Sequence, residues 1–598
     1  MAVHPTALSP DAPRPLPRLV SRAPSLQDWI PVVAVPVSCR ASHFHSGILQ
    51  LVYHPEQSSS TILRADILAD DANVADRGDA PAHSIPVLQG YRCVRRVRRQ
   101  ILPNRPQFDW AMQQECLFYD SEPLDNDHGT EALVVLLPDF DHLERDRGDR
   151  RLPYYHPQVH ALAFRYFSGP SGTAESATLR IDLVPLPSDP IVAPLPPGDR
   201  LFRTGQMLIK YAAKVCNGQA VGYQKRIHHD LLVGRTAVQD TYQRLKDKYQ
   251  TDLDSLSPSP RVTFRWMLNS WQESTDATKH VFEDVAIAAW LVVYWAEVYP
   301  ELGGKPPGGF VDVGCGNGLL VYILASEGYA GYGFDLRERK SWSTYTSPQP
   351  DLRVQSLNPV EIISQALAVD GGLPRTAWPF PRDAFLIFNH ADEMTPWCPL
   401  LAALTRGDEV GFLNIPCCLH ELVGRFERQT YSIPAGFLAS LPQPPSPSEP
   451  GPAPGPSTDS PLPPDLHPLL LPFYAASPLS YAPGGSNKSS KKKEEDKSCA
   501  AGDDASILGG RYHAYQLYLA HLTLRCGFVP AREALRIPST KNFGLVGGRS
   551  ARSPGPTPPR RRPEEVRDEV AALVREVQQR GEWKARRPEG RAGDRQHA

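Results

Sequence analysis

The distribution of apolar positions divides the chain into two parts of different character. Residues 26 to about 200 carry short apolar runs, such as ALVVLLP at 132–138 and ATLRIDLVPL at 177–186, which are broken by Pro, Gly and Asp. This pattern predicts strands rather than long helices. Residues 201–250 have helical spacing and mixed charge, and residues 278–300 predict a second helix that is apolar on most faces and ends at a proline. The N-terminal part is therefore predicted to be an α+β module.

A strand–turn–helix pattern begins at Gly308 and repeats. Five apolar runs predict strands, in the order GFVDVG, YGFD, LRVQSL, AFLIFN and VGFLNIP. Runs such as AFLIF, which lack polar alternation, are typical of parallel strands covered by helices on both faces. Residues 509–528 predict a helix that leads into a sixth strand, and residues 535–548 predict a seventh. The predicted fold class is α/β, with a doubly wound sheet of seven strands.

Composition separates the folded parts from the rest. The 598 residues include 62 prolines, about twice the average share. They cluster at 437–505, a segment that is proline-rich and then charged, which predicts a disordered insertion. The predicted organisation is a disordered N-terminus at 1–25, a strand-rich and then helical module at 26–250, the two parts of the α/β domain at 251–436 and 506–550 on either side of the insertion at 437–505, and a Pro/Arg linker with a charged helix at 551–598.

Charge and cysteine content restrict the class of protein. The 64 Lys and Arg residues nearly balance the 66 Asp and Glu residues, so a polyanionic partner has to be argued from local patches. The ten cysteines contain no C-x-x-C pair, which argues against a zinc ribbon or a disulfide framework and favours a reducing compartment. No apolar stretch reaches the length of a membrane span, and the first residues lack the apolar core of a secretory signal. We therefore expect a cytoplasmic protein with no membrane partner.

The glycine-rich turn after the first α/β strand indicates a ligand that contains a nucleotide. Gly314, Gly316 and Gly318 alternate between a strand and a helix, where backbone N–H groups can approach a ligand without obstruction by side chains. A dinucleotide fingerprint would place its third glycine at Leu319, three residues after the second. A nicotinamide or flavin dinucleotide is therefore disfavoured.

Two aspartates favour S-adenosylmethionine as the ligand. Asp312 precedes the turn, where an acid can meet the ammonium group of this cofactor, and Asp335 ends the second strand, where a carboxylate can accept hydrogen bonds from both ribose hydroxyls. Each aspartate taken singly could be an acid that caps a turn. Together, at the ends of adjacent strands, they predict a methyltransferase fold and leave its substrate open.

Polar residues are concentrated after the fourth strand, in FNHADEMTPW at 388–397. In open α/β sheets the ligand lies beyond the carboxyl ends of the strands, so Asn389 is predicted to contact the cofactor, and His390, Asp392 and Glu393 to face the transferred methyl group. The segment lacks the Asn/Asp-Pro-Pro-aromatic sequence of many amino-group methyltransferases. Methylation of an amino group is therefore not supported.

Several motifs in order along the chain resemble those of the tRNA (uracil-2′-O-)-methyltransferase family, which modifies uridine 44 of tRNA, notably serine tRNA. The resemblance runs from about residue 260 to 548 apart from the insertion, and more loosely through the N-terminal part. The motifs are TDATKHVFEDVAIAAWL, FVDVGCGNGLLVYIL, GFDLRERKSW, FNHADEMTPW, NIPCCLHE and LRIPSTKN. The family implies a Rossmann-like class I S-adenosylmethionine-dependent methyltransferase fold and an enzyme that methylates a ribose hydroxyl.

A ribose 2′-hydroxyl is a poor nucleophile near neutral pH, so the protein has to align it with the methyl group and ease the loss of its proton. Asp392 is the first choice for contact with the hydroxyl, followed by Glu393. Many ribose methyltransferases use a Lys-Asp-Lys-Glu set, which is not complete here. Lys541, Lys279 and Glu421 could fill part of it, although Lys541 could instead contact a phosphate and Lys279 could be a solvated helix residue.

Contacts with the RNA are predicted at three places. Arg337, Arg339 and Lys340 follow Asp335, and His390 and Trp397 lie in the segment after the fourth strand. The run YRCVRRVRRQ at 91–100 adds five arginines in the N-terminal module. Arginine fits phosphates and stacks on bases, although such a run can also be a solvated face. The expected partner is tRNA, with no DNA, and the chain is expected to act as a monomer.

Two features leave alternatives. Cys417, Cys418, His420 and Cys398 could suggest a metal, but adjacent cysteines without a second spaced pair are more typical of buried packing, so no metal is predicted. A methyltransferase of the same fold that acts on another RNA position or on a small molecule is a rival interpretation. A catalytically silent RNA-binding subunit is another.

Overall fold

The chain forms two compact units, Met1–Gln224 and Lys225–Ala598, and each is described by itself. The structure is a computed structural model, and it describes residues 5–8, 29–72, 88, 90–106, 108–121, 130–168, 177–188, 195–196, 198–223, 230–248, 271–368, 378–441, 510–539, 541–548, 562–581 and 583. The predicted boundary at residue 250 is wrong, because helix α4 (Arg235–Lys248) packs against helix α6 (Ala277–Val298) of the second unit.

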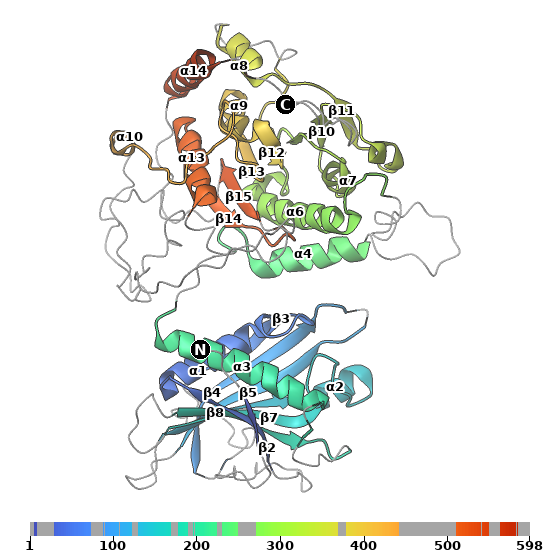
Figure 1. Ribbon diagram of the computed structural model, residues 1–598. Helices are drawn as coiled ribbons and strands as arrows, with labels where there is room; N and C mark the ends of the chain where they lie inside the picture. Colours follow the sequence, from blue (N-terminus) through green and yellow to red (C-terminus); the bar gives the residue numbers. More distant parts are fainter. Residues whose placement is uncertain are drawn as a thin grey trace, which may run out of the picture. The chain divides into compact units, whose positions relative to one another are not determined.

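The first unit is built on one antiparallel sheet in the order β1-β2-β8-β7-β6-β5-β4-β3 (Figure 1). Its strands are β1 (Thr6–Ala7), β2 (Ile30–Val37), β3 (Ile62–Asp71), β4 (Tyr91–Pro103), β5 (Met112–Ser121), β6 (Glu131–Pro138), β7 (Val159–Phe167) and β8 (Ala177–Pro185). Its helices are α1 (Ala41–Tyr53), α2 (Phe140–Arg147) and α3 (Arg200–Ala220), with a 3-10 turn at Pro55–Gln57. Helices α1 and α3 pack against each other and bury their apolar stripes on one face of the sheet. The predicted disorder of residues 1–25 is wrong at β1, which pairs with β2.

The second unit contains a seven-stranded sheet in the order β11-β10-β9-β12-β13-β15-β14 (Figure 1). Its strands are β9 (Phe310–Val313), β10 (Gly331–Asp335), β11 (Asp351–Val354), β12 (Phe385–Asn389), β13 (Gly411–Ile415), β14 (Ala531–Ala534) and β15 (Phe543–Gly547). Strands β9 to β13 pair in parallel, whereas β15 runs antiparallel to both β13 and β14. The apolar runs therefore correspond to strands. The direction of β15 is the exception to a wholly parallel sheet.

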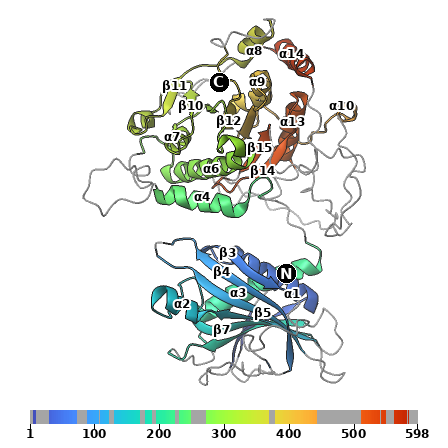
Figure 2. The same cartoon turned by 180° about the vertical axis from the view of Figure 1, so that it is seen from behind.

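Helices cover both faces of this sheet because each strand alternates its apolar side chains between two cores. Phe385 and Ile387 of β12 belong to the core that contains α6 and α7 (Leu319–Ser326), whereas Leu386 and Phe388 belong to the other. That second core contains side chains of α8 (Pro359–Ala368), α9 (Cys398–Leu404), α13 (Arg511–Arg525) and α14 (Pro563–Arg580). The reverse view shows where these four helices lie (Figure 2). The carboxyl ends of β9, β10, β12 and β13 therefore share one edge of the sheet.

The remaining elements are short. They are the 3-10 turns at Pro300–Leu302, Lys340–Thr344 and Asp392–Trp397, and helix α10 (Ala435–Ser440), which extends past the predicted start of the insertion at residue 437. Most of the predicted insertion and of the Pro/Arg linker lies outside the described residues. Among the described residues, no helix combines the length and the apolar character that a membrane crossing requires.

Candidate functional site

The turn after β9 forms the base of the site. Gly314, Gly316 and Gly318 all have φ between 52° and 76°, a left-handed conformation that costs glycine little. A Cβ on Gly316 would meet no atom within 4 Å, so one side of the turn is open, whereas a Cβ on Gly318 would lie 2.7 Å from Leu352 Cδ1. The Gly316 N–H donates to Asp335 Oδ2 at 3.0 Å, which ties the turn to the end of β10.

Three aspartates gather beside this turn. Asp312 is 2% exposed, and its Oδ1 has no hydrogen-bond partner among the described residues. Burial, and then the charges of Asp284 and Asp335, raise the pKa of Asp312 well above its ordinary value. A buried carboxylate without compensation is costly, and a cationic ligand would remove that cost. The predicted pair Asp312 and Asp335 is thus brought together at the ends of neighbouring strands.

Helix α6 contributes two acids that the sequence analysis did not assign to the site. Asp284 is buried, accepts a hydrogen bond from Asn317 Nδ2 at 3.4 Å, and has its pKa raised to about 7, chiefly by burial and then by Glu283. Glu283 is 3% exposed. The sequence did contain a signal for these two residues. Two adjacent acids in the otherwise apolar run VFEDVAIAAWLVVYW need a partner if they are buried, because an uncompensated buried charge is costly.

The end of β12 supplies a second group of polar side chains. Asn389 is the last residue of the strand, and its Oδ1 is buried without a hydrogen-bond partner among the described residues. The next residue, His390, has a left-handed φ of 55° and places Nε2 3.1 Å from Glu283 Oε1. Such backbone strain in non-glycine residues is concentrated at functional sites. Glu283 therefore orients the imidazole of His390 at the carboxyl edge of the sheet.

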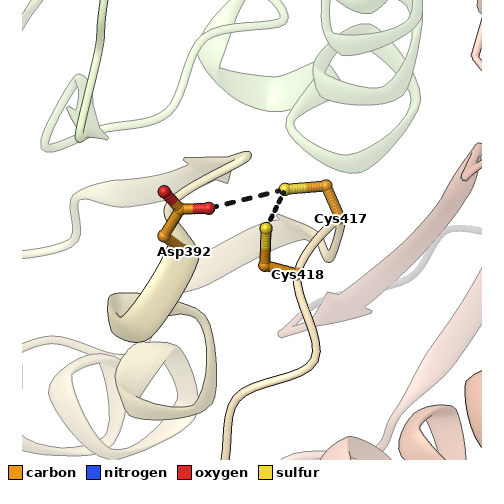
Figure 3. Close-up of side chains that lie close together, drawn as sticks. All are labelled: Asp392, Cys417 and Cys418. Carbon is orange, nitrogen blue, oxygen red and sulfur yellow. Dashed lines mark hydrogen bonds between the residues drawn. The ribbon is translucent and has the colours of Figure 1, made fainter. Parts of the chain in front are cut away.

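Asp392 lies beside the turn after β13 (Figure 3). Its Oδ1 is 3.8 Å from Cys417 Sγ, and Cys417 Sγ is 3.5 Å from Cys418 Sγ. Lys541, whose position follows β14, donates from Nζ to the Cys417 carbonyl. The structure thus brings the predicted residues Asp392 and Lys541 to the same turn, with Glu393 next to Asp392 at the start of the 3-10 turn.

Other predicted site residues are placed differently. Trp397 is 0% exposed and packs edge-on against Trp583 in the core, so the prediction that it contacts the substrate is wrong: the 3-10 turn that begins at Asp392 directs it inward. Glu421 is paired with Arg428 and Arg580, and Lys279 is exposed. Neither of these two is held at the turn after β13 in the way that Lys541 is.

The basic residues after β10 divide into two groups. Arg339 forms an ion pair with Asp335 at 3.3 Å, so it supports the carboxylate that it follows. Arg337 and Lys340 are exposed, and Arg337 contacts the turn through its backbone N–H, which donates to Asp335 Oδ1 at 3.4 Å. Their side chains are therefore accessible to a large substrate.

The arginine run of β4 is mostly engaged within the first unit. Arg95 pairs with Asp70, Arg96 pairs with Glu115, and Arg99 is buried against Gln114 and two backbone carbonyls. Within this run, Arg92 and Arg98 are the exposed arginines. The run therefore contributes fewer accessible charges than its sequence indicates.

Comparison with known proteins agrees with this organisation. A family model described as "TRM44-like, N-terminal bet v1-like domain" matches residues 8–226, and one described as "Predicted AdoMet-dependent methyltransferase" matches residues 232–359. Two curated proteins, each named tRNA (uracil-O(2)-)-methyltransferase, are similar along most of the chain. The Neurospora crassa protein is 33% identical over 87% of this chain and 86% of its own length, and the Schizosaccharomyces pombe protein is 32% identical over 88% and 86%. The chain therefore belongs to the tRNA (uracil-O(2)-)-methyltransferase family.

Proposed function

We propose that the protein transfers a methyl group from S-adenosylmethionine to the ribose 2′-hydroxyl of a uridine in tRNA, at position 44 and in serine tRNA. The observation that carries the proposal is the buried acidic cluster of Asp284, Asp312 and Asp335 beside an open glycine turn. This cluster suits a ligand that joins positive charge to a ribose. The methyltransferase family model and the names of the relatives support the same activity.

The strand order supports a Rossmann-like class I methyltransferase fold. From β9 the next strands in the chain, β10 and β11, are added on one side, and β12 and β13 are added on the other. The order of the strands therefore switches between β9 and β12, which are parallel neighbours in the sheet. Ligands of doubly wound sheets bind beyond the carboxyl ends of the strands at such a switch point. The glycine turn follows β9, and the polar segment that begins at Asn389 follows β12, so cofactor and acceptor are both assigned to this edge.

The residues fit the cofactor as follows. S-adenosylmethionine supplies an electrophilic methyl group on a sulfonium centre. Asp312 offers its unpartnered Oδ1 to the ammonium group, with Asp284 adding negative charge behind it, and Asn389 offers a second unpartnered oxygen. Asp335 is assigned to the ribose hydroxyls: its Oδ1 accepts from Arg337 and Arg339, whereas its Oδ2 accepts from Gly316 and can accept a further hydrogen bond.

At the acceptor side, Asp392 is assigned to the 2′-hydroxyl, with Glu393 and Lys541 beside it. The hydroxyl has to lose its proton during transfer, and a carboxylate or imidazole within hydrogen-bond reach lowers that barrier. His390 lies two residues before Asp392 and is oriented by Glu283. A base that is itself held by a buried carboxylate keeps its geometry through the reaction.

Contacts with tRNA are assigned to exposed basic residues in both units. Arg337 and Lys340 lie next to the cofactor turn, and Arg92 and Arg98 lie on β4. The N-terminal unit is assigned to the shape of the tRNA rather than to its base sequence. The enzyme is proposed to act in the cytoplasm as a monomer.

Ribose-methylation mapping of tRNA tests the proposal directly. Cells that lack the gene are complemented with the wild-type chain, with Asp392→Ala, or with Asp351→Ala. Asp351 is the matched control because it is an exposed acid at the amino end of β11, away from the carboxyl edge of the sheet. The proposal predicts that one 2′-O-methyluridine, at position 44, is lost and is restored by wild type and by Asp351→Ala. Its persistence without the gene refutes the proposed function, and full restoration by Asp392→Ala identifies a silent subunit.

A further inference from the structure

We infer that Asp392, Cys417 and Cys418 form a binding site for a zinc ion. The Asp392 carboxylate and the two thiols each offer one ligand atom, and these atoms all lie within 4.8 Å of one another. The residues come from the ends of two neighbouring strands, β12 and β13. Their side chains converge on one point in the close-up view (Figure 3).

The spacing of the ligand atoms fits tetrahedral coordination. Zn–S bonds of about 2.3 Å and Zn–O bonds of about 2.0 Å place two sulfurs about 3.8 Å apart, and a sulfur and an oxygen about 3.5 Å apart. The observed separations are 3.5 Å for the two sulfurs and 3.8 Å for Cys417 Sγ and Asp392 Oδ1. These two separations are each within a few tenths of an ångström of the tetrahedral values, and the third pair of ligand atoms lies within 4.8 Å.

The surrounding charge also suits a divalent ion. Two thiolates and a carboxylate carry three negative charges, of which a zinc ion neutralises two. Lys541 supplies the remaining positive charge, because its ammonium group donates to the carbonyl of Cys417. Thiolates select zinc over magnesium or calcium, which prefer oxygen ligands. All three ligand residues are half-buried, so an ion can reach them.

The sequence predicted no metal because Cys417 and Cys418 lack a second spaced pair. The third ligand, Asp392, comes from another strand, and only the fold brings it to the cysteines. Three protein ligands leave a fourth position for water or another oxygen, as in catalytic zinc sites. If the proposed function holds, that position lies on the acceptor side of the site, where a bound hydroxyl would lose its proton more readily. Asp392 would then ligate the ion through one carboxylate oxygen and keep the other for the hydroxyl. This step rests on the proposed function, whereas the binding of zinc does not.

Metal content of the purified full-length protein tests the inference. The reduced protein is stripped with a chelator, reloaded with Zn²⁺, freed of excess ion and analysed for zinc. We expect one zinc ion per chain in the wild type, and loss of that ion in the Cys417→Ser/Cys418→Ser double variant. Cys93→Ser is the matched control, because Cys93 is a half-buried thiol in the first unit, and it should retain the ion.

Two further measurements keep the test decisive if the double variant fails to fold. Asp392→Asn should weaken zinc binding at least tenfold, and Co²⁺ bound to the wild type should show the charge-transfer absorption of cobalt–thiolate bonds. No zinc in the wild type, equal zinc in the double variant, or a cobalt spectrum without thiolate bands would overturn the inference. Cofactor binding is measured in parallel on the stripped protein; if it is retained while zinc is absent, the metal site fails and the proposed function stands.

Discussion

Asp284 gives a prediction in which stability and function change in opposite directions. Burial raises the pKa of this carboxyl from 3.8 to about 7. At higher pH the folded protein holds a charge that the unfolded chain solvates better, so the group destabilises the fold. The full shift corresponds to about 4 kcal/mol, at about 1.4 kcal/mol per pKa unit. Asp284→Asn removes the charge and keeps an oxygen that can accept the hydrogen bond from Asn317.

The sign follows from the direction of the shift. Below the unfolded pKa of 3.8 the carboxyl is protonated in both states and contributes no pH dependence; as pH rises toward about 7 the unfolded chain releases this proton first, so the wild type loses stability. The stabilisation by Asp284→Asn, measured as the free energy of unfolding in urea, should therefore grow by about 3 kcal/mol between about pH 5 and about pH 8. A stabilisation that does not change with pH would refute this reasoning.

The same substitution should weaken the binding of S-adenosylmethionine. Asp284 contributes negative charge beside Asp312, and its loss should lower affinity about tenfold at about pH 8, equivalent to one pKa unit of interaction. Isothermal titration calorimetry measures this affinity. Glu533→Gln is the matched control: its pKa is also raised to about 7 by burial, but its carboxylate accepts from the backbone of Asp230 and Leu232. Equal affinity of Asp284→Asn and wild type would contradict the proposed cofactor site.

Four further substitutions test other parts of the account. Gly318→Ala should lower cofactor affinity at least tenfold by calorimetry, because its φ is 76° and the new Cβ would lie 2.7 Å from Leu352 Cδ1; wild-type affinity would refute this constraint on the turn. Trp397→Ala should cost about 3–5 kcal/mol of unfolding free energy in urea, and a loss of tRNA affinity with little change in stability would instead support substrate contact. Arg92→Ala and Arg98→Ala should each reduce the salt dependence of tRNA binding by about one phosphate contact, and unchanged filter-binding slopes would exclude these two residues from the interface.

The sequence was most informative where chemistry follows a local pattern. Apolar runs without alternation predicted the buried strands, and the glycine turn with Asp312 and Asp335 predicted which strand ends meet. A parallel sheet makes such inferences possible, since the carboxyl ends of its strands share one edge. The antiparallel β15 was not distinguishable, because strand direction leaves no mark on an apolar run.

What the sequence did not predict depends on contacts between distant segments. The sequence assigned no role to Glu283, which lies on an apolar helix. The fold places its Oε1 3.1 Å from His390 Nε2. Arg95 looked accessible in an arginine run, but its partner Asp70 lies on the neighbouring strand β3. Trp397 follows polar residues that face the site, yet one 3-10 turn reverses its direction into the core.

The most direct test of the central claim is methyl transfer by the purified protein to two tRNAs that differ in one atom. Both are serine tRNAs, one with uridine at position 44 and one with 2′-deoxyuridine at that position, and the product is read by mass spectrometry of nucleosides after incubation with S-adenosylmethionine. The account predicts 2′-O-methyluridine from the first tRNA and no methylation of the second. Methylation of both, or of neither while the cofactor is bound, would contradict it.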